Sequence, residues 1–371
     1  MEIVIYIFAC IGIWYLLNII WIIYGFTKIK SFESESLQPK TKFSIIVPFR
    51  NEVENLPNLL SSIEKLNYPN DLFEVILVDD ESDFRFASPI RFRSGQIIVI
   101  DNIRISNSPK KDAINTAIEI AKNDWIITTD ADCIVGPNWL TTFDAFIQKN
   151  NTRMVAAGVF YKTNDSFLDA FQQLDLLSLQ GTTIGSFGNN QAFMCNGANF
   201  CYQKSFFTAL NGFDGNDKIA SGDDVFLLQK AIQKDKNNVY FLKSESIIVQ
   251  TKTEKTWTDL FNQRVRWASK TANYNSLYSK QLGVSVLMIN LFWVLSFGFW
   301  IFGILSLNYF GLLLFSKFLI DFVLLYKTSV FFKTNLRYVL LSSFVYPLFC
   351  ISVALYSLFG NYTWKGRRFK K

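Results

Sequence analysis

The sequence contains no histidine, which excludes histidine-based zinc sites and serine–histidine catalytic pairs. A general base that works at neutral pH is therefore expected to be a carboxylate. Cysteine is also scarce: the five cysteines are odd in number and show no CxxC spacing. Neither a zinc ribbon nor a disulfide framework is indicated, and we expect reduced thiols in a cytoplasmic setting.

Charged residues are few, at 18% of the 371 residues, and long uncharged runs lie near the two ends of the chain. A chain that is 50% apolar is too hydrophobic to be disordered. The net charge of +6 arises at the ends, because residues 281–371 hold nine basic residues and one acidic residue, whereas residues 43–280 hold 24 basic and 27 acidic residues. This distribution favours membrane headgroups as a partner and excludes nucleic acid. We expect a membrane protein that carries a soluble domain.

The first apolar run, Ile3 to Phe26, is long enough to cross a hydrocarbon core of about 30 Å as a helix. It lacks a basic leader and a cleavage site, so residues 1–26 are predicted to be a retained transmembrane helix. Lysines follow it at Lys28 and Lys30. The positive-inside rule then places the next domain in the cytoplasm, in a multi-pass protein of the inner membrane and cell envelope.

The C-terminal region, residues 284–359, is predicted to hold two or three further spans. The convincing spans are Val284–Leu307 and Tyr338–Phe359. The segment Tyr309–Tyr326 contains Lys317 and Asp321, which could pair on one helix face, so it either spans against its neighbours or lies in the interface. Three crossings would place the basic tail, residues 360–371, outside, and two would bring it inside. The sequence leaves this open.

Residues 43–280 have the pattern of βαβ units, which predicts an α/β catalytic domain with a mostly parallel sheet. The predicted strands are Phe43–Pro48, Glu74–Asp79, Gln96–Asp101, Trp125–Asp130 and Arg153–Tyr161. The predicted helices are Glu54–Leu66, Lys110–Ala121, Pro137–Gln148, Ser166–Leu179, Asp223–Gln233 and, as an interfacial helix near the end of the domain, Thr256–Tyr274.

Acidic residues gather where ligands of such sheets bind, beyond the carboxyl ends of strands. The three acidic sites are Asp79-Asp80, Asp130-Ala131-Asp132 and Asp223-Asp224. A pair of carboxylates two residues apart suits Mg²⁺ or Mn²⁺, which also binds water and phosphate oxygens. Any one acidic pair could instead be a helix cap or a solvated turn, but three such pairs indicate a site.

Two further clusters fit the same chemistry. Lys110 and Lys111 open a helix, where a diphosphate would be stabilised, although a solvated lysine pair is the alternative. Gln263, Arg266 and Trp267 precede the first C-terminal span. The arginine could bind a phosphate and the tryptophan a sugar, or the two could form an interfacial belt.

Together these motifs resemble the membrane-bound family 2 glycosyltransferases over roughly residues 43–270. The matching motifs are Ile45-Ile46-Val47-Pro48 with Asn51-Glu52, Val78-Asp79-Asp80-x-Ser82, Lys110-Lys111-x-Ala113-x-Asn115, Asp130-x-Asp132, Gly222-Asp223-Asp224-x-x-Leu227 and Gln263-x-x-Arg266-Trp267. The resemblance implies a GT-A nucleotide-diphospho-sugar transferase domain flanked by transmembrane helices. It also implies a metal-dependent, inverting transfer of the hexosyltransferase type, with Mg²⁺ or Mn²⁺ as cofactor.

The resemblance assigns roles by position. Asp79 and Asp80 would hold the uracil and ribose, and Asp130 the ribose, diphosphate and metal. Asp132 would bind the metal, Asp224 would be the catalytic base and Asp223 its supporting carboxylate. The remaining site residues would be Lys110, Lys111, Arg266 and Trp267 on the donor side, and Gln263 with Trp267 on the acceptor side.

Two residues depart from the family pattern: Asp223 stands where glutamate is frequent, and Glu81 stands where glycine is common. The first shortens the supporting carboxylate by one methylene, and the second alters the turn after Asp80. Neither change removes a role.

The sequence therefore predicts transfer of a sugar from a nucleotide-diphosphate donor, with a UDP-sugar favoured, to a lipid or lipid-linked glycan at the membrane. A processive polysaccharide synthase is the alternative. A catalytically inactive nucleotide-sugar-binding scaffold is a third possibility, disfavoured by the intact Asp132 and Asp224.

Overall fold

The computed structural model describes residues 2–34, 37–83, 97–217, 219, 221–359, 362–364 and 367–369. The chain forms two compact units. One, the sheet unit, comprises Lys30–Lys162 and Met194–Lys252, and the other, the helical unit, comprises Met1–Ile29, Thr163–Phe193 and Thr253–Lys371. Residues 163–193 and 253–280, which the sequence assigns to the catalytic domain, thus cluster with the long apolar helices. We describe each unit by itself.

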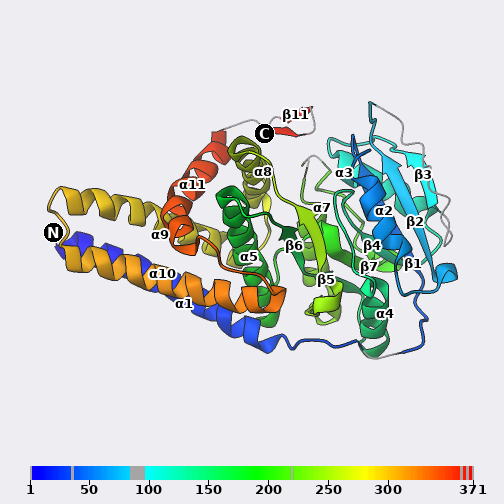
Figure 1. Ribbon diagram of the computed structural model, residues 1–371, viewed down its shortest axis with the longest axis horizontal. Coiled ribbons are helices and arrows are strands. Elements are labelled where there is room, and N and C mark those ends of the chain that lie inside the picture. Colours follow the sequence, from blue (N-terminus) through cyan, green and yellow to red (C-terminus); the bar gives the residue numbers. More distant parts are fainter. Residues whose placement is uncertain are drawn as a thin grey trace. The chain divides into compact units, whose positions relative to one another are not determined.

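The sheet unit is built on a seven-stranded sheet in the order β3-β2-β1-β4-β7-β5-β8 (Figure 1). Its strands are β1 (Phe43–Phe49), β2 (Phe73–Asp79), β3 (Ile97–Asp101), β4 (Trp125–Thr128), β5 (Met154–Ala157), β7 (Phe200–Gln203) and β8 (Val239–Leu242). Only β7 pairs antiparallel with its neighbours. A second sheet pairs β6 (Val159–Lys162) with β9 (Val249–Lys252) in parallel. The prediction of a mostly parallel α/β sheet is confirmed.

The order of the central strands determines where ligands can bind. The chain proceeds outward from β1 to β2 and β3, and then returns to the other side of β1 to form β4. In register, Phe43 of β1 faces Phe73 of β2 and Trp125 of β4. The carboxyl ends of these parallel strands therefore meet at one edge, beside a reversal in strand order, which is where doubly wound sheets bind ligands.

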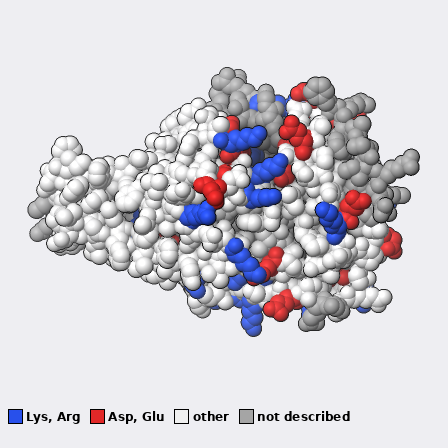
Figure 2. Space-filling view, viewed as in Figure 1, with Lys and Arg blue, Asp and Glu red and all other residues white. Residues whose placement is uncertain are grey.

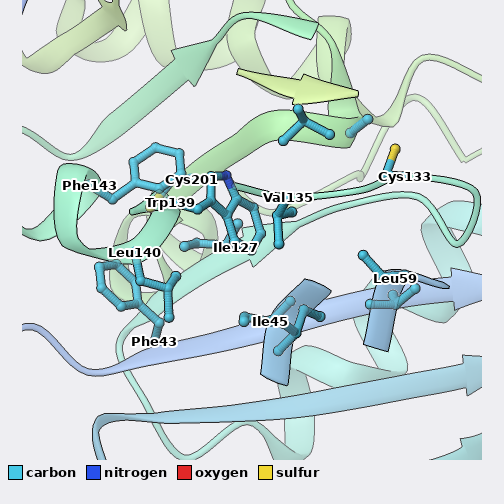
Figure 3. Close-up of a cluster of buried hydrophobic side chains, with 14 of the residues drawn as sticks. Phe43, Ile45, Leu59, Ile127, Cys133, Val135, Trp139, Leu140, Phe143 and Cys201 are labelled. Atoms are coloured by element: carbon cyan, nitrogen blue, oxygen red, sulfur yellow. The ribbon is translucent and has the colours of Figure 1, made fainter. Parts of the chain in front are cut away.

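Alternating side chains of the central strands bury one face of the sheet under two helices. The core on this face contains Phe43 and Ile45 of β1, Leu59 of α2 (Leu56–Glu64), and Trp139 and Phe143 of α4 (Trp139–Lys149), as Figure 3 shows. The period of two along each strand places every second residue in this core. The remaining helices of the unit are α3 (Pro109–Ile120), α6 (Lys204–Ala209) and α7 (Asp223–Asp235).

The helical unit contains α1 (Glu2–Lys28), α5 (Phe167–Gly188), α8 (Trp257–Ser269), α9 (Leu277–Ile301), α10 (Leu307–Phe332) and α11 (Val339–Phe359), followed by a hairpin of β10 (Tyr362–Trp364) and β11 (Arg367–Phe369). Four helices are long and apolar enough to cross a membrane: α1, α9, α10 and α11. In Figure 2 the visible face of α1, α9 and α10 shows few charged side chains, as lipid contact requires. The rest of the predicted tail, apart from the hairpin, lies outside the described residues.

Glycines let α5 approach α1 closely. A Cβ built on Gly185 would lie 2.3 Å from the carbonyl oxygen of Ile22, and one on Gly188 would lie 1.9 Å from that of Gly25. Small residues of this kind allow helix backbones to touch in membrane proteins. The predicted end of this helix at Leu179 is therefore wrong, because packing against α1 keeps the glycine-containing segment helical to Gly188.

Two other predicted elements need correction. The strand predicted for Arg153–Tyr161 is divided into β5 and β6, which belong to different sheets. Gly158 separates them, and its carbonyl accepts hydrogen bonds from Asn199 Nδ2 at 2.8 Å and from the Val249 N–H at 3.1 Å. The helix predicted for Thr256–Tyr274 ends earlier, at Ser269, and is followed by a short 3₁₀ turn.

The segment containing Lys317 and Asp321 forms the middle of α10. Lys317 Nζ lies 2.7 Å from Asp321 Oδ2, and Tyr15 of α1 donates to Asp321 Oδ1 at 2.5 Å. The expected pairing of the two charges is thus present. It lowers the cost of placing them in an apolar helix.

Candidate active site

The carboxyl ends of β2 and β4, which flank β1, bring acidic groups to one edge of the sheet, as the sequence predicts. Asp79 closes β2, Asp80 follows it, and Asp130 and Asp132 follow β4. Asp79 and Asp80 are buried, whereas Asp130 and Asp132 are partly exposed. Solvent therefore reaches the second pair, as a ligand would.

The first acidic pair lies in a tightly bonded turn. Asp79 Oδ1 accepts hydrogen bonds from Ser82 N at 3.0 Å and from Ser82 Oγ at 2.5 Å. Asp80 Oδ1 accepts from Asn102 Nδ2 at 2.7 Å and faces Arg104 Nη1 at 3.5 Å. These bonds fix both carboxylates in one orientation.

Lys110, in the first turn of α3, lies at the centre of the other carboxylates. Its Nζ is 2.7 Å from Asp130 Oδ1 and 3.5 Å from Asp223 Oδ2. Burial by itself would lower the pKa of Lys110, but the neighbouring Asp130 and Asp223 outweigh it and raise the pKa above its ordinary value. The ammonium is therefore charged at all physiological pH values.

Lys111 points elsewhere. It is 1% exposed, and its Nζ donates to the carbonyl oxygens of Asn216 at 2.6 Å and Ile219 at 2.9 Å. It also lies over the ring of Phe226, at 5.1 Å. Lys111 thus anchors the segment that precedes α7 in the described structure, while Lys110 faces the carboxylates.

Asp223 and Asp224 begin α7, directly after Gly222, whose φ of +83° favours glycine. Asp223 is buried and Asp224 is partly exposed. Asp224 Oδ1 accepts from the N–H of Val225 at 2.7 Å, and Oδ2 from the N–H of Gly197 at 2.9 Å. The carboxylate of Asp224 is therefore held in one orientation by backbone donors at a helix N-terminus.

Gly197 belongs to this site, although sequence analysis did not single it out. A Cβ built on it would lie 3.1 Å from Asp223 Oδ2 and 3.4 Å from Lys110 Nζ. Asn196 caps the short turn that begins at Gly197, and Thr128 Oγ1 donates to the Gly197 carbonyl at 2.7 Å. A larger residue here would force these side-chain atoms to shift by a few tenths of an ångström, so glycine favours the close approach. The pairing of β4 with β7 brings Gly197 to this position.

Asp130 and Asp132 are of the residue type that binds divalent cations such as Mg²⁺. Both supply hard carboxylate oxygens two residues apart, and Asp132 Oδ2 accepts from Thr251 Oγ1 at 3.3 Å, which orients it. Among the residues that the structure describes, no group of three or more His, Cys, Asp or Glu side chains is placed to hold a metal. Two carboxylates would suffice for Mg²⁺ if water and substrate phosphates complete its coordination.

Gln263, Arg266 and Trp267 lie on α8, in the helical unit. Gln263 Nε2 donates to Glu254 Oε1 at 2.6 Å. Between the motif residues, Arg264 is buried; its Nε lies 2.5 Å from Asp175 Oδ2 of α5 and its guanidinium lies 4.2 Å from the centroid of the Trp267 ring. A second contact ties this region to α5, since Gln172 Oε1 accepts from the N–H of Glu254 at 2.8 Å.

Comparison with known proteins shows what this arrangement resembles. Residues 44–210 match the family described as Glycosyl transferase family 2, a match that covers less than half of the chain. The matched residues include the sites at Asp79, Lys110, Asp130 and Gly197, while α7 and α8 lie beyond them.

Curated relatives are distant. The chain is 26% identical over 112 residues to the poly(ribitol-phosphate) beta-N-acetylglucosaminyltransferase TarS of Staphylococcus aureus. The matched region covers 30% of this chain and 20% of TarS. It is 25% identical over 245 residues to the probable glycosyltransferase YdaM of Bacillus subtilis, covering 63% of this chain and 56% of YdaM. The chain thus spans well under two thirds of the length of either relative.

The fold has a solved counterpart. The mannosyltransferase PcManGT of Pyrobaculum calidifontis, solved in complex with GDP-Man and Mn²⁺, superposes with a TM-score of 0.56 at 15% identity. The match covers 96% of this chain and 99% of PcManGT. The chain therefore has a GT-A-like α/β fold, with long apolar helices at both ends of the sequence, as expected.

Proposed function

We propose that the protein is an inverting, membrane-bound glycosyltransferase that moves a hexose from a nucleotide-diphosphate donor to a lipid or lipid-linked glycan. The observation that carries this proposal is the cluster of Lys110, Asp130, Asp223 and Asp224 around Gly197, at the edge of the sheet where nucleotides bind. The match of residues 44–210 to glycosyltransferase family 2 supports the same chemistry.

Asp224 has the properties of the catalytic base. Its two backbone donors fix the carboxylate, and its partial exposure lets an acceptor hydroxyl approach. In the reaction the acceptor oxygen attacks the anomeric carbon as Asp224 takes its proton, and the bond to the nucleotide diphosphate breaks on the opposite face. Because the acceptor oxygen attacks from the face opposite the leaving diphosphate, the anomeric configuration is inverted. Asp223 holds Lys110 beside the base, which balances the negative charges.

The donor side is assigned to the first acidic pair and to Lys110. Asp79 and Asp80 would bind the base and ribose, and the Lys110 ammonium, next to Asp130, would bind the diphosphate as its charge grows. Lys111 would have to release two carbonyl oxygens before it reached a donor, so we assign the diphosphate to Lys110. A UDP-sugar is the donor we favour.

Asp130 and Asp132 would hold Mg²⁺ or Mn²⁺, because their oxygens fit these ions. When bound, such a cation neutralises charge on the leaving diphosphate. PcManGT, whose structure contains Mn²⁺ and GDP-Man, supports a divalent ion in this fold. Since Lys110 holds Asp130 Oδ1, the lysine must share this carboxylate with the metal or move aside.

The acceptor side is assigned to α8, where Gln263 and Trp267 would contact the acceptor and Arg266, with Trp267, the donor diphosphate. The apolar helices support an acceptor that resides in the membrane, and the basic residues after α1 support a cytoplasmic catalytic domain at the inner membrane. The similarity to TarS, which is named as a poly(ribitol-phosphate) beta-N-acetylglucosaminyltransferase, supports sugar transfer as the reaction. A processive synthase would need a polar channel, and these apolar helices have few polar residues that could line one.

The proposal is tested by incubating membranes that contain the protein with a panel of nucleotide sugars and measuring nucleotide release and labelled lipid. One donor should give Mg²⁺-dependent release together with a labelled lipid-extractable product. An Asp224→Asn variant should give neither and should still bind that donor. Binding without turnover for every donor, in the wild type, would instead identify an inactive scaffold.

A further inference from the structure

The last long helix, α11, is ambiguous by composition. It has 21 residues and a mean hydropathy of 2.0, which would allow it to cross a membrane. If it crossed together with α1, α9 and α10, the basic tail would lie on the side opposite the sheet unit. The contacts of α11 within the helical unit distinguish this arrangement from another.

The start of α11 lies beside the point where the chain leaves the sheet unit. Arg337, just before α11, forms an ion pair with Asp165, and the ring of Tyr338 packs edge-on against Phe167 at 5.6 Å between centroids. Asp165 follows shortly after Lys162, the last residue of β6. The start of α11 is therefore on the same side of the membrane as the sheet unit.

The second half of α11 lies along α8. Val353 packs against Val265. The rings of Phe349 and Tyr356 lie 6.2 Å and 5.5 Å from that of Phe261. The strand that follows α11, β10, also contacts α8. The end of α11 is thus at the depth of α8.

The composition of α8 fixes that depth. It carries Asp259, Arg264 and Arg266 within 13 residues and follows β9 after a linker of a few residues. A helix with so many charges is costly in the hydrocarbon core and is typical of the membrane interface. Both ends of α11 are consequently anchored to segments on the side of the sheet unit.

The direction of α11 agrees with these contacts. In Figure 1, α1, α9 and α10 run alongside one another, and the turn between α9 and α10 lies at the same end as the N-terminus. By contrast, α11 runs across these three helices. Its path does not lead toward the end where the α9–α10 turn lies.

We propose that α11 lies in the plane of the membrane, on the side of the sheet unit, and that only α1, α9 and α10 cross. One face of α11 packs on α5, α8 and α9. The opposite face is an exposed apolar stripe that would be immersed in lipid acyl chains; its large residues are Leu341, Phe344, Leu348, Leu355 and Phe359. This spacing of three or four residues defines a single helix face.

The charges of the connecting segments fit this arrangement. Lys333 and Arg337 lie between α10 and α11, and five basic residues lie between Lys365 and Lys371. With α11 in the plane, all of these residues share one side with Lys28 and Lys30, as the positive-inside rule requires. The turn between α9 and α10, residues 302–306, has no charge and lies on the other side. The proposal resolves the conflict of parity that the sequence leaves open.

The first arm of the test measures the depth of α11 in lipid. Spin labels at Leu341, Leu348 and Leu355, in the full-length protein with its native cysteines replaced, are compared by their accessibility to oxygen and to a water-soluble nickel chelate. Matched labels at the exposed α10 residues Leu312, Leu319 and Val330 serve as the control. We expect one common depth on α11, whereas α10 should be deepest at its middle label. A deep middle label flanked by two shallow labels on α11 would overturn the proposal.

The second arm measures the side on which the tail lies. Single cysteines replace Phe369 in the tail, the exposed Asp71 of the sheet unit and the exposed Ile304 of the α9–α10 turn, in sealed vesicles treated with a membrane-impermeant maleimide. The tail cysteine should be labelled in the same vesicle orientation as Asp71→Cys and not with Ile304→Cys. Labelling together with Ile304→Cys would show that α11 crosses. Neither arm depends on the proposed enzymatic activity.

Discussion

Replacing Asp175 by asparagine should uncouple the α8 motif from its support and should lower transfer to the acceptor more than it weakens donor binding. Asp175 and Arg264 are 7% and 6% exposed, and their closest atoms are 2.5 Å apart. Arg264 in turn covers the ring of Trp267 at 4.2 Å and contacts Gln263. The pair therefore positions two of the motif residues that we assign to the acceptor side.

The size of the effect follows from the burial of this pair. Removing one partner of a buried ion pair costs about 3–5 kcal/mol. Asparagine keeps the volume and can still accept a hydrogen bond, so the relevant loss is that of a charge-assisted bond, about 1.5–3 kcal/mol. If the correctly placed conformation of α8 loses about 2 kcal/mol of stability, the rate of transfer should fall by roughly 30-fold, since about 1.4 kcal/mol corresponds to a factor of ten.

The assay compares transfer to a membrane acceptor with donor affinity, both in lipid vesicles. Asp175→Asn should lower the rate of transfer by a larger factor than it raises the Kd for the donor nucleotide, since Asp79, Asp80 and Lys110 of the donor side are unchanged. Asp175→Glu should restore part of the rate. The exposed Asp259→Asn, on the same helix as Arg264, is the matched control and should lower the rate less than about threefold, as exposed charge contacts contribute little. Transfer at the wild-type rate in Asp175→Asn would refute the positioning role, and a parallel loss of donor affinity would indicate general unfolding.

Four other outcomes are expected. Asp224→Asn should lower transfer by about 10²–10⁴-fold with donor affinity retained, because a base acts on the acceptor proton, and a parallel loss of nucleotide binding would contradict this role. Asp132→Ala should weaken donor binding in Mg²⁺ titrations, and activity that persists in chelator would remove the metal from the reaction. Gly185→Ala should lower the free energy of unfolding, measured in thermal melts, by about 1–3 kcal/mol, because its Cβ would lie 2.3 Å from a backbone oxygen of α1. The control Gly283→Ala, whose Cβ would have no atom within 4 Å, should cause no such loss. Equal melting of the two variants would argue against the close α1–α5 contact. Burial raises the pKa of Glu254 above its ordinary value of 4.5. Its contribution to the free energy of unfolding is therefore complete below that pH and is lost as the pH rises through the higher pKa. Glu254→Gln should remove this pH dependence from the free energy of unfolding, and an unchanged pH dependence would contradict the assignment.

The strands that the sequence predicts are those whose own amino-acid composition indicates a strand. β1 and β2 each have seven residues, most of them apolar, and β4 is a short, mostly apolar segment that an acidic motif follows, so composition indicates them. By contrast, β7, β8 and β9 have four residues each and become strands only through their partners. Short strands carry little local preference, and pairing decides their structure.

The acidic residues of the site could likewise be predicted, because they follow strands or open a helix. Gly197 could not be, since its role depends on the approach of a 3₁₀ turn to Asp223 and Asp224, far away in sequence. The different environments of Lys110 and Lys111 could not be predicted from the sequence either. Adjacent lysines in the first turn of a helix point in different directions, and only the contacts with Asn216 and Ile219 show which of them is buried.

The glutamate at position 81 shows how a departure from the family pattern can leave the site unchanged. Glu81 has a φ of +58°, a left-handed conformation that glycine adopts without strain and that costs another residue about 1–2 kcal/mol. Arg50 Nη1 donates to the carbonyl oxygens of Asp80 at 2.8 Å and of Glu81 at 2.5 Å, so these bonds offset the strain. The turn after Asp80 therefore keeps the shape that glycine would allow, and the hydrogen bonds from Ser82 to Asp79 are preserved within it. The substitution changes the energy of this turn without changing the side chains that it presents to the donor side.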